Sequence, residues 1–88
     1  MKIKEDFLLR QVADTWVVLP LGSAIVSMDG MLNLNETGAL LWKTLEQGAD
    51  REQLVDALLA EYAVDRGTAA EDVDEFIEKL NAIHCLEL

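Results

Sequence analysis

An abrupt change of hydrophobic pattern in residues 31–45, MLNLNETGALLWKTL, constrains the fold more than any other feature of this sequence. Residues 31–34 read as a short strand, whereas the apolar residues from Ala39 to Leu45 have helical spacing. Asn35 stands at the junction and is a favourable N-cap residue, while Glu36 suits the positive end of a helix dipole. The junction therefore predicts a strand that is aimed by a capped helix.

The residues before this junction predict antiparallel hairpins. Residues 7–12 and 16–19 are rich in β-branched, aromatic and other apolar side chains, and Ala13-Asp14-Thr15 between them suits a turn. Pro20 and Gly22 predict the end of this first ladder. This part of the chain is therefore expected to supply the first two strands.

A second hairpin is predicted from the sequence that follows. Asp29-Gly30 suits a two-residue turn with positive φ angles, and it lies between the apolar runs 24–28 and 31–34. The strand at residues 31–34 is therefore expected to enter the helical part of the chain directly.

Three helices are predicted after the strands, each with its own start signal. The first runs over 36–47 and stops at Gly48, and the second opens at Asp50, with Gln53 completing a capping box. The third opens at Thr68, with Glu71 in the matching position. The apolar stripes of the three helices are Leu40, Leu41 and Leu45; Leu54, Ala57, Leu58 and Tyr62; and Val73, Phe76, Ile77, Leu80, Ile83 and His84.

The order of these elements predicts an α+β fold of the winged-helix-like kind, with N-terminal antiparallel β-hairpins followed by three α-helices. The loop at 64–67 is short enough to make the second and third helices direct neighbours. Residues 85–88 alternate again and suit a closing strand. With 88 residues and no linker or repeat, the chain is expected to form a single domain, residues 1–88.

The charge of the chain argues against several classes of function. The formal net charge is −10 with a pI near 4.2, and the seven basic residues form no cluster after Lys4. Repulsion from phosphate disfavours nucleic acid and anionic membranes as partners. Cys85 is the only cysteine, no secretory signal is evident, and no segment approaches the roughly 20 apolar residues that span a bilayer. A cytoplasmic location is expected.

The sequence offers little material for catalysis. His84 and Cys85 are the only residues of their kinds, and adjacent residues at a helix end point apart, so they predict neither a nucleophile with its base nor a metal site. The acids at the start of the third helix suit a solvated face that complements the helix dipole. No catalytic residue, cofactor or metal is therefore expected, and Trp16 and Trp42 are interpreted as core or half-core residues.

Exposed strand edges are the alternative source of function. Two short hairpins leave at least one edge with unpaired backbone groups, and no Pro or Lys guards residues 31–34. An extended peptide can add to such an edge as a further strand, with pockets beneath alternate side chains giving selectivity. A groove between this strand and the apolar side of the third helix is the predicted receptor.

A family resemblance supports the same interpretation. The chain resembles the PqqD family, the group of coenzyme PQQ biosynthesis protein D, also called the RiPP recognition element. The resemblance runs from about Phe7 to Leu88. It is carried by LNETGALLW at 34–42, Gly48, LVDALLAEY at 54–62 and EDVDEFIEKL at 71–80.

The resemblance implies a non-catalytic peptide chaperone. Such domains bind the leader segment of a ribosomally made precursor peptide as an added strand and present it to a modifying enzyme, often a radical SAM enzyme. Some of the residues that the resemblance assigns to this task also serve the core. The peptide-binding residues carried over in this way are Met31, Leu32, Asn33 and Leu34 on the strand and Asp72, Val73, Phe76, Ile77 and Leu80 on the helix.

Other classes of protein fit the pattern less well. A winged-helix transcription factor needs a basic recognition helix, but the second helix carries only Arg51 and the third only Lys79 against many acids. An acyl carrier protein needs a modifiable serine at a helix start, where neither Ser23 nor Ser27 stands. A regulatory or self-associating interaction module remains the alternative, because an open strand edge can also pair with a second copy and form a homodimer.

Overall fold

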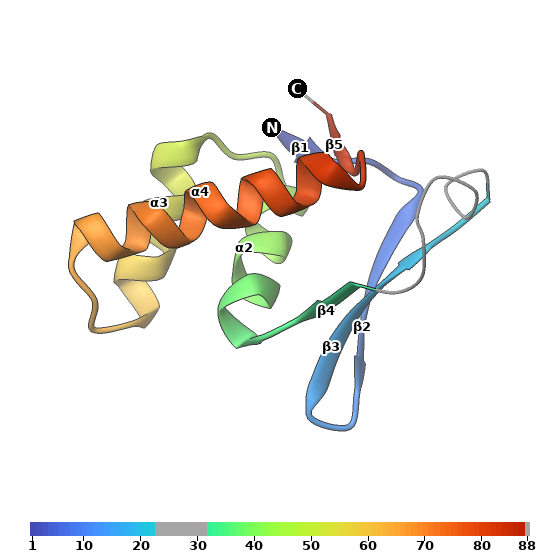
Figure 1. Ribbon diagram of the computed structural model, residues 1–88, viewed down its shortest axis with the longest axis horizontal. Coiled ribbons are helices and arrows are strands. Elements are labelled where there is room, and N and C mark those ends of the chain that lie inside the picture. The colour runs from blue at the N-terminus through green and yellow to red at the C-terminus, as the bar shows by residue number, and fades with distance from the viewer. Residues whose placement is uncertain (23–31, 88) are drawn as a thin grey trace.

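A strand-rich N-terminal part leads into three helices in the computed structural model, which describes residues 1–22 and 32–87 (Figure 1). The predicted α+β class is confirmed. The elements in chain order are β1 (Lys2–Ile3), β2 (Phe7–Val12), β3 (Thr15–Pro20), β4 (Leu32–Leu34), α2 (Glu36–Glu46), α3 (Arg51–Glu61), α4 (Arg66–Ala82) and β5 (Leu86–Glu87).

Strands β2, β3 and β4 form one antiparallel sheet in that order. The predicted first hairpin is confirmed: Phe7 pairs with Pro20 and Val12 with Thr15, so the turn consists of Ala13 and Asp14. Ala13 adopts a φ of 56°, in the left-handed region. The turn at Asp29-Gly30 and the strand predicted at 24–28 lie outside the described residues.

The first two helices begin where their capping residues predict. The side chain of Asn35 accepts a hydrogen bond from the Gly38 N–H at 2.8 Å. Asp50 accepts from the Gln53 N–H at 2.8 Å, and the Gln53 side chain accepts from the Asp50 N–H at 2.9 Å, which completes the predicted capping box. Gly48, with a φ of 85°, ends the α2 segment as expected.

The predicted start of the third helix is wrong. Helix α4 begins at Arg66, and its N-cap is Asp65, whose carboxylate accepts from the Thr68 N–H at 2.7 Å. Thr68 is therefore already inside the helix. Asp65 and Thr68 are both good capping residues, and the carboxylate three residues upstream takes the N–H that would otherwise be unsatisfied.

The predicted end of the apolar stripe on this helix is also wrong. Helix α4 ends at Ala82, and His84 is exposed with a φ of 57°, so its side chain leaves the helical face. The chain turns there and enters β5, which confirms the predicted closing strand. Strand β5 pairs with β1, with Ile3 opposite Leu86, so a two-stranded sheet joins the two ends of the chain.

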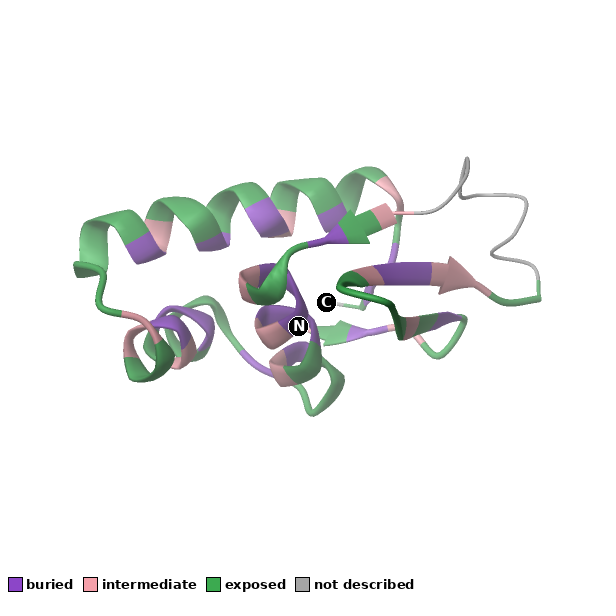
Figure 2. Cartoon of the chain, turned by 90° about the horizontal axis from the view of Figure 1, so that it is seen from below, coloured by how far each residue is buried: buried purple, intermediate pink, exposed green. Residues whose placement is uncertain are grey.

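The core lies where α2 meets the other two helices and the sheet. Helix α4 turns a regular row of buried positions toward the rest of the molecule and an exposed face away from it (Figure 2). Val55 is also fully buried, although the predicted stripe of its helix did not include it. The large side chains that are less than 2% exposed are Trp42, Leu41, Leu45, Leu54, Leu58, Leu80, Val18, Val55, Val73 and Cys85.

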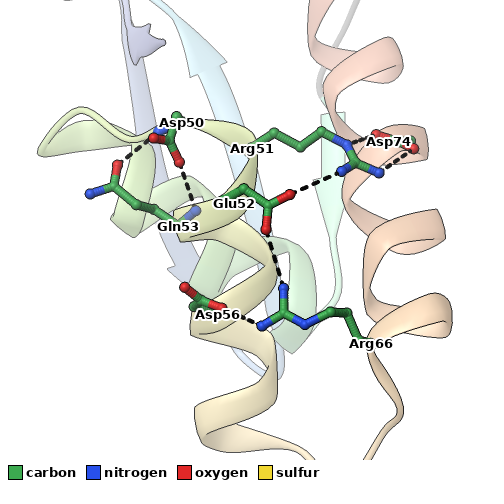
Figure 3. Close-up of polar contacts among 7 residues, drawn as sticks. All are labelled: Asp50, Arg51, Glu52, Gln53, Asp56, Arg66 and Asp74. Carbon is green, nitrogen blue, oxygen red and sulfur yellow. Dashed lines mark hydrogen bonds and ion pairs between the residues drawn. The ribbon is translucent and has the colours of Figure 1, made fainter.

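Ion pairs on the surface connect α3 with α4 (Figure 3). The Arg51 guanidinium donates two hydrogen bonds to the Asp74 carboxylate, at 2.7 and 3.0 Å. Arg66, the first residue of α4, contacts Asp56 at 2.7 Å and Glu52 at 3.2 Å on α3. These exposed contacts link the two helices and confirm that α3 and α4 are neighbours.

Among the described residues, no helix is long and apolar enough to cross a membrane.

Acid should weaken the connection between the two helices. The hydrogen bond from Arg51 lowers the pKa of Asp74 below its ordinary value of 3.8. A lowered carboxyl pKa stabilises the fold above pH 3.8, and this contribution is lost as the pH falls through the folded-state pKa. Asp74→Asn should therefore lower the free energy of unfolding slightly at pH 7, with a difference from the parent that closes below pH 3.8. Urea denaturation across this range measures it.

Glu78→Gln is the matched control, because Glu78 is an exposed acid of the same helix that makes no ion pair with the described residues. Equal effects of the two substitutions at pH 7 would show that the Asp74 contact does not stabilise the fold.

Candidate functional site

Strand β4 forms one edge of the three-stranded sheet. It pairs with β3 through Leu34 opposite Trp16, Asn33 opposite Val17 and Leu32 opposite Val18. Its other side has no strand partner among the described residues. This side of β4 is the predicted docking edge.

The register shows which backbone groups face that edge. The Leu21 N–H donates to the Asp6 carbonyl at 2.7 Å, next to the pair of Phe7 and Pro20, so it continues the ladder between β2 and β3. Hydrogen-bonded pairs alternate along an antiparallel ladder. Leu21, Leu19 and Val17 therefore all turn their backbone groups toward β2. The neighbour of Val17 in the register, Asn33, must then turn its N–H and C=O away from β3. Asn33 thus presents one donor and one acceptor to the open edge.

A groove runs between β4, the start of α2 and one side of α4. It consists of two adjoining hollows of about 200 and about 470 Å³. Both hollows are lined by Asn35, Gly38, Phe76 and Lys79, so they form one continuous feature, which we call the β4–α4 groove. The residues that line only one hollow are Thr37, Leu41, Asp72 and Glu75 in the smaller, and Asp14, Thr15, Asn33 and Leu34 in the larger.

The groove has an apolar base and a glycine where two elements approach closely. Phe76 is 6% exposed and Leu41 is 1% exposed, so both present only a small surface to the groove. A Cβ atom on Gly38 would lie 3.2 Å from the Cβ of Leu34 and 3.3 Å from the Asn35 side-chain oxygen. The absence of a side chain at Gly38 therefore lets the first turn of α2 lie against the end of β4.

The predicted peptide-binding residues divide between the groove and the core. Asn33, Leu34, Asp72 and Phe76 line the groove. Val73 and Leu80 are fully buried, and Leu32 and Ile77 are half-buried and packed against the core. Met31 lies outside the described residues. The buried members belong to the core, and the role of all nine predicted residues in peptide binding stays a prediction.

Two charged residues of the groove escaped the sequence prediction. Glu75 and Lys79 line it from α4, three and seven residues after Asp72. The spacing of 72, 75, 76 and 79 places all four residues on one helical face. This spacing is the signal in the sequence that indicates them. The apolar residues alone indicate only the stripe that faces the core.

Cys85, Trp16 and Trp42 do not line this groove. Cys85 is buried, and burial raises the pKa of its thiol to about 11, so the thiol is protonated at neutral pH. Trp42 is fully buried, which confirms its predicted place in the core, and Trp16 is half-buried with the Lys43 ammonium 4.2 Å from its ring centroid. The described parts of the chain contain no group of three or more His, Cys, Asp or Glu side chains suited to a metal ion.

Comparison with known families identifies the kind of domain. The profile of the family described as coenzyme PQQ synthesis protein D (PqqD) matches residues 15–86. The chain belongs to the PqqD family. The match covers β3, β4, all three helices and part of β5, and so includes every residue of the β4–α4 groove except Asp14.

Two solved structures resemble this PqqD-family chain over nearly its whole length. TbiB1 in complex with the TbiA(beta) leader peptide is 33% identical, with a TM-score of 0.78 and coverage of 99% of this chain and 95% of that chain. Lasso peptide synthetase B1 complexed with the leader peptide is 24% identical, with a TM-score of 0.71 and coverage of 91% and 88%. Comparison with curated proteins gave no match.

The Asn35 cap should stabilise the junction of β4 and α2, which forms part of the groove. Asn35→Ala removes the side-chain acceptor of the Gly38 N–H and should lower the free energy of unfolding by about 1 kcal/mol. Asn35→Ser is the control, since serine can accept the same hydrogen bond and should retain most of the stability. Urea denaturation measures both variants, and an alanine variant as stable as the parent would contradict this role of the cap.

Proposed function

We propose that residues 1–88 act as a single peptide-binding domain, a non-catalytic adaptor for the leader segment of a ribosomally synthesised precursor peptide. The peptide adds as a strand to the open edge of β4 and lays its side chains into the β4–α4 groove. The domain then presents the peptide to a modifying enzyme, for which a radical SAM enzyme is one candidate, in the cytoplasm.

The backbone of Asn33 carries this proposal. Its N–H and C=O face the open edge of β4, where they can exchange hydrogen bonds with an extended chain, while the groove beside them offers room for side chains. Backbone pairing supplies affinity for any extended peptide, and the groove supplies the selection between sequences. Strand edge and groove together suit a linear segment better than a small molecule.

The similarity to TbiB1 supports a leader peptide as the occupant. That protein is bound to a leader peptide and is 33% identical over almost the whole of this chain. The chemistry of the groove also fits a binding role, because its lining offers carboxylates, an amine, amides and hydroxyls but neither a histidine nor a thiol. Binding and presentation account for these features without a catalytic step.

Removing one backbone donor tests the strand addition. Asn33→Pro deletes the outward N–H, and a proline is tolerated at an edge whose donor is not used by the ladder. The unpaired peptide acceptor should weaken binding about fivefold or more, since an unsatisfied group costs about 1–3 kcal/mol and about 1.4 kcal/mol is tenfold. Titration calorimetry with leader segments of the small peptides encoded beside the gene measures this loss.

Two variants serve as controls for that experiment. Asn33→Ala keeps the backbone donor and removes only the side chain, so it should weaken binding much less than Asn33→Pro and measures what the side chain contributes. Gln11→Pro removes an outward N–H from β2, the opposite edge of the sheet, because Gln11 alternates with the hydrogen-bonded residues Arg10 and Val12. A folded Asn33→Pro variant that binds as tightly as Gln11→Pro would overturn docking at β4.

Self-association is the competing use of the same edge. Two copies pairing through β4 would form a symmetric homodimer that the Asn33→Pro substitution disrupts. Sedimentation of the free protein, with and without the leader segment, separates the two uses. We expect the peptide to dissociate any such dimer, because both occupy the same backbone groups.

A further inference from the structure

We propose that the β4–α4 groove selects leader segments in which a lysine or arginine stands two residues from an apolar anchor. This inference rests on the proposed function and names the class of peptide that the groove accepts. It is drawn from the arrangement of charges on the walls of the groove and from the apolar surface between them.

The walls of the groove are predominantly acidic. Asp14 from the turn between β2 and β3, together with Asp72 and Glu75 from α4, faces a single cation, Lys79. These four groups make no ion pair with any residue in ranges 1–22 and 32–87. A cation from a bound peptide would therefore meet carboxylates that no protein cation already neutralises.

An acid on the opposite side of α4 is paired with an arginine, in contrast to the acids of the groove. Asp74 lies on that side and is held by two hydrogen bonds from Arg51 (Figure 3). Asp72 and Glu75 flank it in the sequence but point to the groove, where the structure supplies no arginine. Acids that are not needed to join helices and that surround a receptor surface suit recognition of a ligand cation.

The spacing follows from comparing a helix with an extended peptide. Asp72 stands one helical turn before Phe76, which forms the apolar base, and a turn is about 5.4 Å long. In an extended peptide, residues i and i+2 lie on the same face about 6.6 Å apart. In a peptide that runs alongside α4, a side chain that reaches Phe76 and Leu41 thus brings its second neighbour beside Asp72 and Glu75.

Encounter with the groove should favour the same peptides. The chain carries a formal net charge of −10, so its field attracts a basic segment and repels an acidic one. This contribution is spread over the surface and is screened by salt. A test must therefore separate the groove carboxylates from the total charge.

Two double variants make that separation. Asp72→Asn with Glu75→Gln neutralises the groove wall. Glu71→Gln with Glu78→Gln removes the same two charges from exposed positions of α4 that do not line the groove and make no ion pair with the described residues. Any difference between the two variants reflects the position of the charges.

The probe is a display library of random 12-residue peptides, selected on the folded parent protein in 50 mM salt and counter-selected on the Asn33→Pro variant. We expect the selected peptides to carry Lys or Arg two positions from an apolar residue. The groove variant should bind them about two- to thirtyfold more weakly than the parent, which is the range for two exposed ion pairs, and the matched variant should bind them much more nearly as the parent does. Replacing the selected Lys or Arg of the peptide with Glu should weaken its binding to the parent protein.

Each alternative outcome identifies what has failed. Selected peptides that depend on the Asn33 donor but lack basic residues would overturn the charge selection and leave the strand-addition proposal standing. Equal weakening by both double variants would also overturn it, in favour of a net-charge effect. If no peptide distinguishes the parent from Asn33→Pro, docking at β4 fails, and the charge selection falls with it.

Discussion

A backbone hydrogen-bonding group at the edge of a sheet is satisfied either by water or by another strand, and Asn33 carries such a donor and acceptor on β4. The alternation of the ladder fixes the direction in which this N–H and C=O point. That direction therefore does not depend on the Asn33 side chain. Leu32 and Leu34 turn their own backbone groups to β3 and their side chains toward the core. One residue thus connects the sheet to the proposed peptide.

The rest of the fold keeps that residue beside a usable surface. Asn35 caps α2 at the end of β4, and Gly38 allows the two elements to lie in close contact. Helix α4 is held on the other side by its buried stripe and by the ion pairs with α3. The groove is the space that remains between these rigid parts, so its shape depends on contacts made well outside it.

Local signals predicted much of this arrangement. The caps at Asn35 and Asp50 and the first hairpin were predictable because the interactions involved span only a few residues. Strand β1 was missed because two residues carry no periodicity and its partner β5 lies at the far end of the sequence. The start of α4 was misplaced because Asp65 and Thr68 are both plausible caps. The groove walls were only partly predicted. A hydrophobic pattern reveals which residues face the core, but it does not reveal which polar residues line a groove.

Hydrogen exchange at the Asn33 amide shows directly whether a bound peptide pairs with the open edge of β4. Heteronuclear NMR can follow this single N–H in labelled protein, alone and with a leader segment of a small peptide encoded beside the gene. If the peptide adds to β4, exchange at Asn33 slows on binding, with shifts along residues 32–34 and at the groove-lining residues of α4. Binding that leaves the Asn33 amide exchanging as in the free protein, or that protects β2 instead, would contradict addition to β4.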